Sequence, residues 1–199
     1  MVDRLVSFGD SCIFGSELKD VKDDYTPSKS TYPAIVANEL GLEYLCLAKP
    51  GASNQYIIKS LLEYPFRGTE VVLIQWTSPS RFGIPLLKGW TDLSPNLNHM
   101  NEAKTLSEEL YRNVEIDKFS TFQFMLCIST AIQKVICSLV MTSNNLVPYA
   151  DDKITKFDGK DFLEFSRSYP HGIGGHPLEE AHVQCAKQII PHIQELISR

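Results

Sequence analysis

Blocks of hydrophobic and polar residues alternate along the chain and predict alternating strands and helices. Four apolar runs have the length of strands, at residues 4–8, 43–48, 70–76 and 135–141. Elsewhere apolar residues recur every three or four positions, which predicts helices at residues 31–40, 53–64, 119–133 and 177–199. The nearly continuous apolar run at 70–76 is typical of a strand buried on both faces of a parallel sheet. The pattern therefore predicts an α/β protein, with helices on both faces of a mostly parallel sheet.

The regularity of this pattern breaks in two places. Residues 77–118 are polar and contain three prolines, and they exceed the usual connection of about 2–6 residues, so we predict a lid or binding loop there. Residues 149–168 are charged and predict irregular structure. Within the last helix, Pro191 is expected to kink or interrupt the helical path. We expect one domain, residues 1–199, with a long insertion at about 77–118.

Composition excludes several classes of function. The chain has 199 residues and a formal net charge of −5, which argues against a protein that binds nucleic acid through a basic face. No apolar run approaches the roughly 18 residues of a membrane span, and the N-terminus lacks the apolar stretch of a signal peptide. The five cysteines form no CxxC pair, as expected for free thiols in a reducing compartment. We therefore expect a cytoplasmic protein that binds neither membrane nor nucleic acid, and composition does not indicate its oligomeric state.

Candidate chemistry lies where ligands bind in such sheets, at the carboxyl ends of the strands. Ser11, in Gly-Asp-Ser after the first strand, is a potential nucleophile that needs a base. His176, in Gly-Gly-His-Pro before the last helix, is the best candidate base. Gly51, after the second strand, has an N–H that could reach an oxyanion beside that of Ser11. Each also has a purely structural interpretation: a turn serine, a histidine that caps the last helix, and a turn glycine.

These segments resemble the SGNH hydrolases, also called GDSL-type esterases, in order and spacing. Gly-Asp-Ser resembles their nucleophile block, Lys-Pro-Gly-Ala-Ser-Asn the block whose glycine lines the oxyanion hole, and His176-Pro177 the block of the general base. The resemblance implies a three-layer α/β/α sandwich of flavodoxin-like architecture. It also implies ester hydrolysis through Ser11 and His176, with Gly51 as an oxyanion donor and with no cofactor or metal.

The chain departs from the family pattern at the third block. That block normally reads Gly-x-Asn-Asp, and its Asn side chain is an oxyanion donor; here Ser78 stands in place of the Asn. Asn54 and Arg81 are nearby candidates to replace the missing donor, and Arg81 could also hold a substrate carboxylate or phosphate.

A second departure lies in the last block, which normally reads Asp-x-x-His. Ile173 stands three residues before His176 and cannot orient an imidazole. Asp10, Asp158 and Asp161 are the carboxylates that we consider as substitutes.

Two functional hypotheses follow. The first is a serine esterase that acts on a small ester, with an O-acetylated sugar or glycan as the substrate class that the family implies. The second is a binding protein with the same fold and little or no turnover, and it is motivated by the two missing side chains. The sequence also leaves open a structural or assembly protein of a virus or phage.

Overall fold

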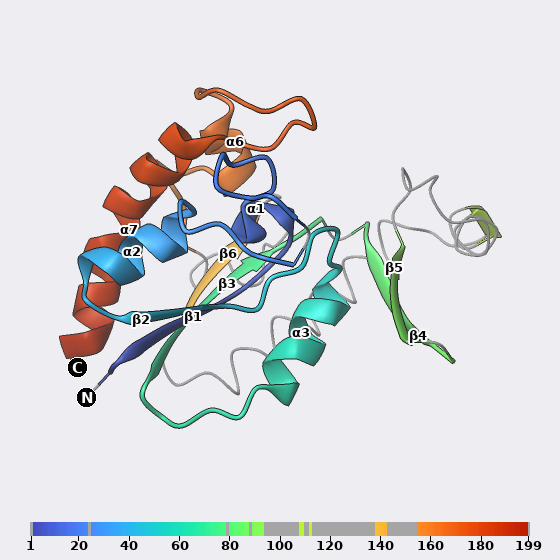
Figure 1. The fold of residues 1–199 in the computed structure, drawn as a ribbon, viewed down its shortest axis with the longest axis horizontal. Coiled ribbons are helices and arrows are strands. Elements are labelled where there is room, and N and C mark those ends of the chain that lie inside the picture. Colours follow the sequence, from blue (N-terminus) through green and yellow to red (C-terminus); the bar gives the residue numbers. More distant parts are fainter. Residues whose placement is uncertain are drawn as a thin grey trace.

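The structure is a computed structural model, shown as a ribbon in Figure 1. It describes residues 2–23, 25–78, 80–87, 89–93, 108–109, 112, 138–142 and 155–198. The predicted helix at 119–133 and most of the segment 94–118 lie outside these residues.

A parallel sheet forms the centre of the described structure, with strand order β2-β1-β3-β6. The strands are β1 (Arg4–Phe8), β2 (Glu43–Cys46), β3 (Glu70–Trp76) and β6 (Ser138–Thr142). All three strand pairings are parallel, so the four carboxyl ends lie at one edge of the sheet. Segments that follow different strands are thereby brought together at this edge.

Helices cover both faces of the sheet (Figure 1). One face carries α2 (Tyr32–Glu39), α6 (Phe162–Ser166) and α7 (Glu179–Ser198), and the other carries α3 (Asn54–Glu63). Because side chains alternate along a strand, Leu5 of β1 packs on the α7 face while Val6 packs on the α3 face. Every residue of β3 is buried, as the apolar run predicts. The three-layer α/β/α architecture is therefore confirmed.

Several local predictions needed correction. A short helix, α1 (Ser11–Phe14), follows β1 directly, and α6 lies within the region predicted to be irregular. The last strand, at 138–142, overlaps the predicted 135–141 and extends one residue beyond it, while residues 135–137 lie outside the described residues. Helix α7 does not end at Pro191, because Ile189 and Ile193 on either side of the proline are both fully buried in the core.

The predicted insertion begins with a β-hairpin of β4 (Phe82–Leu86) and β5 (Gly89–Leu93). The hairpin stands beside the carboxyl edge of the sheet, next to the N-terminal end of α3 (Figure 1). Among the described helices, none has both the length and the apolar character needed to cross a bilayer.

Candidate active site

Ser11 is the first residue of α1, immediately beyond β1. Asp10 caps this helix, because its carboxylate accepts a hydrogen bond from the backbone N–H of Cys12 at 3.0 Å. A Cβ atom at Gly9 would lie only 2.5 Å from Cγ1 of Ile13. The close packing of α1 against the end of β1 therefore needs a glycine there, and this packing places Ser11 at the carboxyl edge of the sheet.

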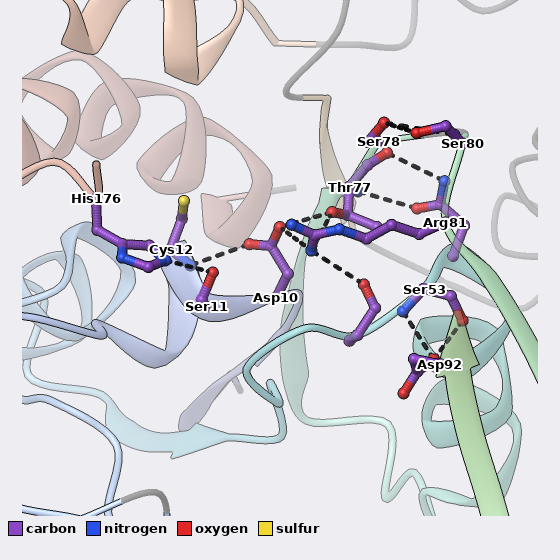
Figure 2. Close-up of polar contacts among 12 residues, drawn as sticks. Asp10, Ser11, Cys12, Ser53, Thr77, Ser78, Ser80, Arg81, Asp92 and His176 are labelled. Carbon is purple, nitrogen blue, oxygen red and sulfur yellow. Dashed lines mark hydrogen bonds and ion pairs between the residues drawn. The ribbon is translucent and has the colours of Figure 1, made fainter. Parts of the chain in front are cut away.

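His176 meets Ser11 across 165 positions of sequence. Its Nε2 lies 2.9 Å from Ser11 Oγ (Figure 2). The histidine lies on the loop that leads into α7, as the sequence predicted, and the loop is closed by a hydrogen bond from Gly172 N–H to the carbonyl of His176 at 2.9 Å. The pair is therefore within the distance at which an imidazole can accept a proton from a hydroxyl.

The carboxylate that faces the other imidazole nitrogen belongs to Glu17. Its Oε2 lies 2.8 Å from His176 Nδ1 and also accepts the backbone N–H of His176 at 3.0 Å. Its Oε1 accepts the backbone N–H of Gly174 at 2.6 Å. The hydrogen bonds from Gly174 and His176 lower the pKa of Glu17 to about 2.

The charge of Glu17 assigns the tautomer of the histidine. An ionised carboxylate can only accept hydrogen bonds, so Nδ1 of His176 carries a proton and donates it to Glu17. In the neutral imidazole, Nε2 is then left to accept the hydrogen of the Ser11 hydroxyl. This is the arrangement that a serine nucleophile requires of its base.

The backbone around Glu17 is shaped to hold this contact. Glu17 adopts a φ of 70°, a left-handed conformation that is uncommon for a residue with a side chain. A Cβ on Gly172 would lie 2.6 Å from Glu17 Cδ, and one on Gly174 would lie 3.0 Å from Glu17 Oε2. The carboxylate thus occupies the space that side chains at either position would need.

Gly51 lies in a tight turn after β2. The turn is closed by a hydrogen bond from Ala52 N–H to the Lys49 carbonyl at 3.1 Å, and Gly51 has a φ of 74°. A hydrogen bond from Lys49 N–H to the carbonyl of Gly9, at 3.2 Å, connects the turn to the segment before Ser11. Within the described part of the chain, the N–H groups of Ser11 and Gly51 have no hydrogen-bond acceptor.

Comparison with known proteins gave matches only among solved structures. No family model and no curated protein matches the chain. A member of the lipolytic G-D-S-L family from Veillonella parvula is similar, with a TM-score of 0.54, 14% identity, and coverage of 98% of this chain and 100% of that one. The extracellular lipase of Streptomyces rimosus gives a TM-score of 0.52, 13% identity, and coverage of 98% and 100%.

A third similar structure is a carbohydrate esterase family 2 enzyme with a carbohydrate binding domain, from Corynascus thermopiles. It gives a TM-score of 0.53 and 16% identity, with 99% of this chain and 67% of that one covered. The chain has the SGNH hydrolase fold. At these identities the similarity shows the fold alone, so the roles of individual residues depend on the geometry above.

In this SGNH fold, none of the three aspartates considered as substitutes lies on the imidazole. Asp10 accepts from Thr77 Oγ1 at 2.6 Å and pairs with Arg81 Nη1 at 3.2 Å, in addition to its contact with Cys12. Asp161 caps α6, and Asp158 lies in a tight turn with a φ of 48°. Glu17 occupies the position beside the imidazole for which Asp10, Asp158 and Asp161 were considered.

Sequence reasoning missed Glu17 because its position does not belong to any of the family's conserved motifs. It lies six residues after Ser11 in a loop of the nucleophile segment, whereas the family pattern directs attention to the residues just before the histidine. The available signal was an acidic residue shortly after Gly15, which ends α1 with a φ of 86°.

The residues considered as replacements for the missing Asn all have partners in the structure. The Asn54 amide contacts the backbone of Thr77, donating to its carbonyl at 3.1 Å and accepting from its N–H at 2.9 Å. Ser78 Oγ lies 2.8 Å from Ser80 Oγ. Asn54 therefore joins α3 to the end of β3, and Ser78 stabilises the turn that follows this strand.

Arg81 connects the segments that follow three strands. Its Nη1 contacts Asp10 Oδ2 after β1 at 3.2 Å, the Ala52 carbonyl after β2 at 3.4 Å, and Thr77 Oγ1 after β3 at 3.0 Å (Figure 2). The guanidinium compensates the buried charge of Asp10, one residue before Ser11. Its contacts are those of a residue that holds the edge of the sheet together.

Cys12 is the other nucleophilic side chain beside Ser11. Burial raises the pKa of its thiol well above the ordinary value, so the thiol stays protonated and is a poor nucleophile. Within the residues that the structure describes, no three His, Cys, Asp or Glu side chains are grouped so that they could hold a metal ion.

Proposed function

We propose that the protein is a serine esterase that hydrolyses small esters, with Ser11 as nucleophile, His176 as general base and Glu17 as the residue that orients the histidine. One observation carries the proposal. The three side chains form a hydrogen-bonded chain, 2.9 Å from Ser11 Oγ to His176 Nε2 and 2.8 Å from His176 Nδ1 to Glu17 Oε2. The SGNH fold supports it, since the structures with this fold include lipolytic and esterase proteins.

The reaction proceeds in two steps. Ser11 Oγ attacks the carbonyl carbon of the ester while His176 Nε2 takes the hydroxyl proton, and the charge of Glu17 stabilises the imidazolium that forms. The tetrahedral intermediate then collapses, and the imidazolium returns its proton to the departing alcohol. Water, activated by the same imidazole, attacks the acyl-serine and releases the carboxylic acid.

The oxyanion in this proposal is stabilised by the backbone N–H groups of Ser11 and Gly51. The proposal assigns no oxyanion donor to Asn54 or Ser78, because the Asn54 amide holds the backbone of Thr77 and Ser78 Oγ lies against Ser80 Oγ. Removal of one oxyanion donor costs about 10²–10³ in rate in a well-studied serine protease. We therefore expect turnover slower than that of an enzyme with all three donors.

The proposed substrate is an ester with a short acyl group on a sugar or glycan alcohol. The structural similarity to a carbohydrate esterase supports this class. No metal or cofactor enters the proposed reaction.

The proposal is tested by turnover and by labelling of Ser11. The parent protein should hydrolyse p-nitrophenyl acetate and react with a fluorophosphonate probe, because a serine activated by a base is phosphonylated. Ser11→Ala should abolish both signals without loss of fold. The matched control is Ser60→Ala, on α3, which covers the face of the sheet opposite α7; this variant should retain both signals. Equal turnover in the Ser11→Ala variant would refute the role of Ser11. Saturable binding of a ligand without labelling would favour a binding protein.

A further inference from the structure

The β4–β5 hairpin contacts the turn that contains Gly51, and one carboxylate makes most of this contact. Asp92 of β5 accepts hydrogen bonds from Ser53 N–H at 2.9 Å and from Ser53 Oγ at 2.6 Å, both on Oδ1. Its Oδ2 pairs with Lys49 Nζ at 2.9 Å. Lys49 and Ser53 lie on either side of Gly51, so a single side chain holds both ends of the turn. Figure 2 shows the contact between Asp92 and Ser53.

The burial of Asp92 shows that this contact is part of the folded structure. The side chain is 6% exposed, although it lies on a two-stranded hairpin, while its partner Lys49 is 41% exposed. Trp90 Nε1 donates to the same Oδ1 at 3.1 Å, which brings the number of donors to four. A buried carboxylate with this many donors is fixed in place and so fixes its partners.

Close packing at Gly83 also places the hairpin against the same segment. Gly83 of β4 pairs with Asp92, and a Cβ at Gly83 would overlap Ser53 Oγ and lie 2.6 Å from the Trp90 ring. The N–H of Gly83 also donates to Gln55 Oε1 at 3.1 Å. Glycine is therefore required where β4 crosses Ser53.

We infer that Asp92 is a positioning residue for catalysis: the hairpin sets the Gly51 turn through Asp92, and thereby keeps the Gly51 N–H directed at the oxyanion. This inference rests on the proposed function. The physical reason is that an oxyanion donor is effective only when it is oriented in advance, and displacement of a catalytic group by about 1 Å can cost 10²-fold in rate. The side chain acts through the turn and has no contact with Ser11 or His176.

Two variants disturb the contact in different ways. Asp92→Ala removes all four hydrogen bonds, and Gly83→Ala pushes β4 away from Ser53 while Asp92 is retained. Each should lower kcat for p-nitrophenyl acetate about 10- to 100-fold, with KM unchanged within about threefold, because the loss arises in the transition state. The acid limb of the pH–rate profile should not move, since the Ser11–His176–Glu17 chain is untouched. Leu87→Ser, at the exposed tip of the hairpin, is the control and should behave as the parent.

A second measurement does not depend on activity. Hydrogen exchange of a peptide covering residues 47–53 should quicken in both variants, while a peptide from β3 keeps its protection. The double variant should lose no more rate than the worse single variant, because both changes act through one turn. If Asp92→Ala does not fold, Asp92→Asn replaces it, with a smaller expected loss of about 3- to 10-fold, since the amide oxygen still accepts from Ser53 while the attraction for Lys49 is lost.

The results separate the two proposals. Unchanged exchange in the turn, an unchanged kcat, or a loss confined to KM would overturn the role of Asp92 while the esterase stands. If exchange of residues 47–53 quickens in the variants but the parent protein has no esterase activity, the proposed esterase function is overturned. The catalytic role of Asp92 is then overturned with it.

Discussion

At the scale of single residues, Glu17 explains how the site is completed without the aspartate that SGNH hydrolases carry before the histidine. Its carboxylate receives three hydrogen bonds, and two of them come from the backbone of the same loop that carries His176. One side chain therefore fixes both the loop and the imidazole. The left-handed backbone of Glu17 has an energetic cost of order 1–3 kcal/mol, which these hydrogen bonds offset.

We predict that Glu17→Gln lowers kcat about 10²- to 10⁴-fold. Gln has only one acceptor oxygen for three donors, so its NH₂ group is turned toward Nδ1 when its oxygen accepts from the backbone. Nδ1 must then accept, the ring proton moves to Nε2, and Ser11 loses its base. The measurement is kcat for p-nitrophenyl acetate, with exposed Glu39→Gln as the matched control.

The low pKa of Glu17 adds a condition on pH. Because the folded-state pKa, about 2, is below the ordinary value, the carboxylate stays charged down to strongly acidic pH and becomes neutral only as the pH falls through about 2. A fall in activity between pH 4 and 7 should therefore arise from a group other than Glu17. The Glu39→Gln control should show the same fall as the parent protein. A Glu17→Gln variant with parental kcat would contradict the orienting role.

At the scale of elements, the site is formed where two loops meet, one after α1 and one before α7. Gly172 and Gly174 leave the space that the Glu17 carboxylate fills. Gly172 is not among the glycines with positive φ, so an alanine there fits the backbone. The three atoms nearest to its methyl group would all belong to the carboxyl end of the flexible Glu17 side chain.

We predict that Gly172→Ala displaces the Glu17 carboxylate from His176, because the new Cβ would lie 2.6 Å from Glu17 Cδ. The expected result is a loss of about tenfold or more in kcat, with a change of less than about 1 kcal/mol in the free energy of unfolding. Activity assays and urea denaturation measure the two effects. Combined with Glu17→Gln, the change should add little, and an additive loss would show that Gly172 acts elsewhere.

Elements with strong local signals could be predicted from the sequence. The apolar run of β3 and the helical spacing of apolar residues in α3 placed both elements within a residue or two of their bounds. The Ser11–His176 pair was predictable through the family resemblance, whose nucleophile and general-base blocks occur in this order along the chain. The hairpin was not, since β4 contains Gly83 and Pro85, which are poor strand residues. Glu17 and Asp92 were not predictable either, because their roles depend on contacts 159 and 39 positions away.

At the scale of the whole molecule, two separate cores flank the sheet, and a histidine is buried in one of them. His182 of α7 is 1% exposed and stacks on Tyr32 of α2, with ring centroids 6.0 Å apart. Its Nδ1 accepts the backbone N–H of Tyr32 at 3.2 Å. Burial lowers the pKa of His182 to about 4, although the nearby charge of Glu179 opposes the shift.

This burial makes stability depend on pH. The pKa of His182 is about 4 in the folded state and 6.5 ordinarily, so between these values the unfolded chain binds a proton that the folded chain does not. The contribution of His182 to the free energy of unfolding should therefore be fully present above pH 6.5 and should be lost as the pH falls toward 4. Below pH 4, titration of His182 should change the stability no further. The loss at pH 4.5 amounts to about 2–3 kcal/mol. Urea denaturation at pH 7.5 and pH 4.5 measures it.

The variant His182→Asn isolates this contribution, because the amide oxygen still accepts the Tyr32 N–H but the side chain does not titrate. Its free energy of unfolding should be lower than that of the parent at pH 7.5 and should approach or exceed the parental value at pH 4.5. Exposed His192→Asn should leave the pH dependence of the parent unchanged. A constant difference between parent and His182→Asn at both pH values would mean that His182 does not link protonation to folding, and that the acid sensitivity of the molecule arises from other groups.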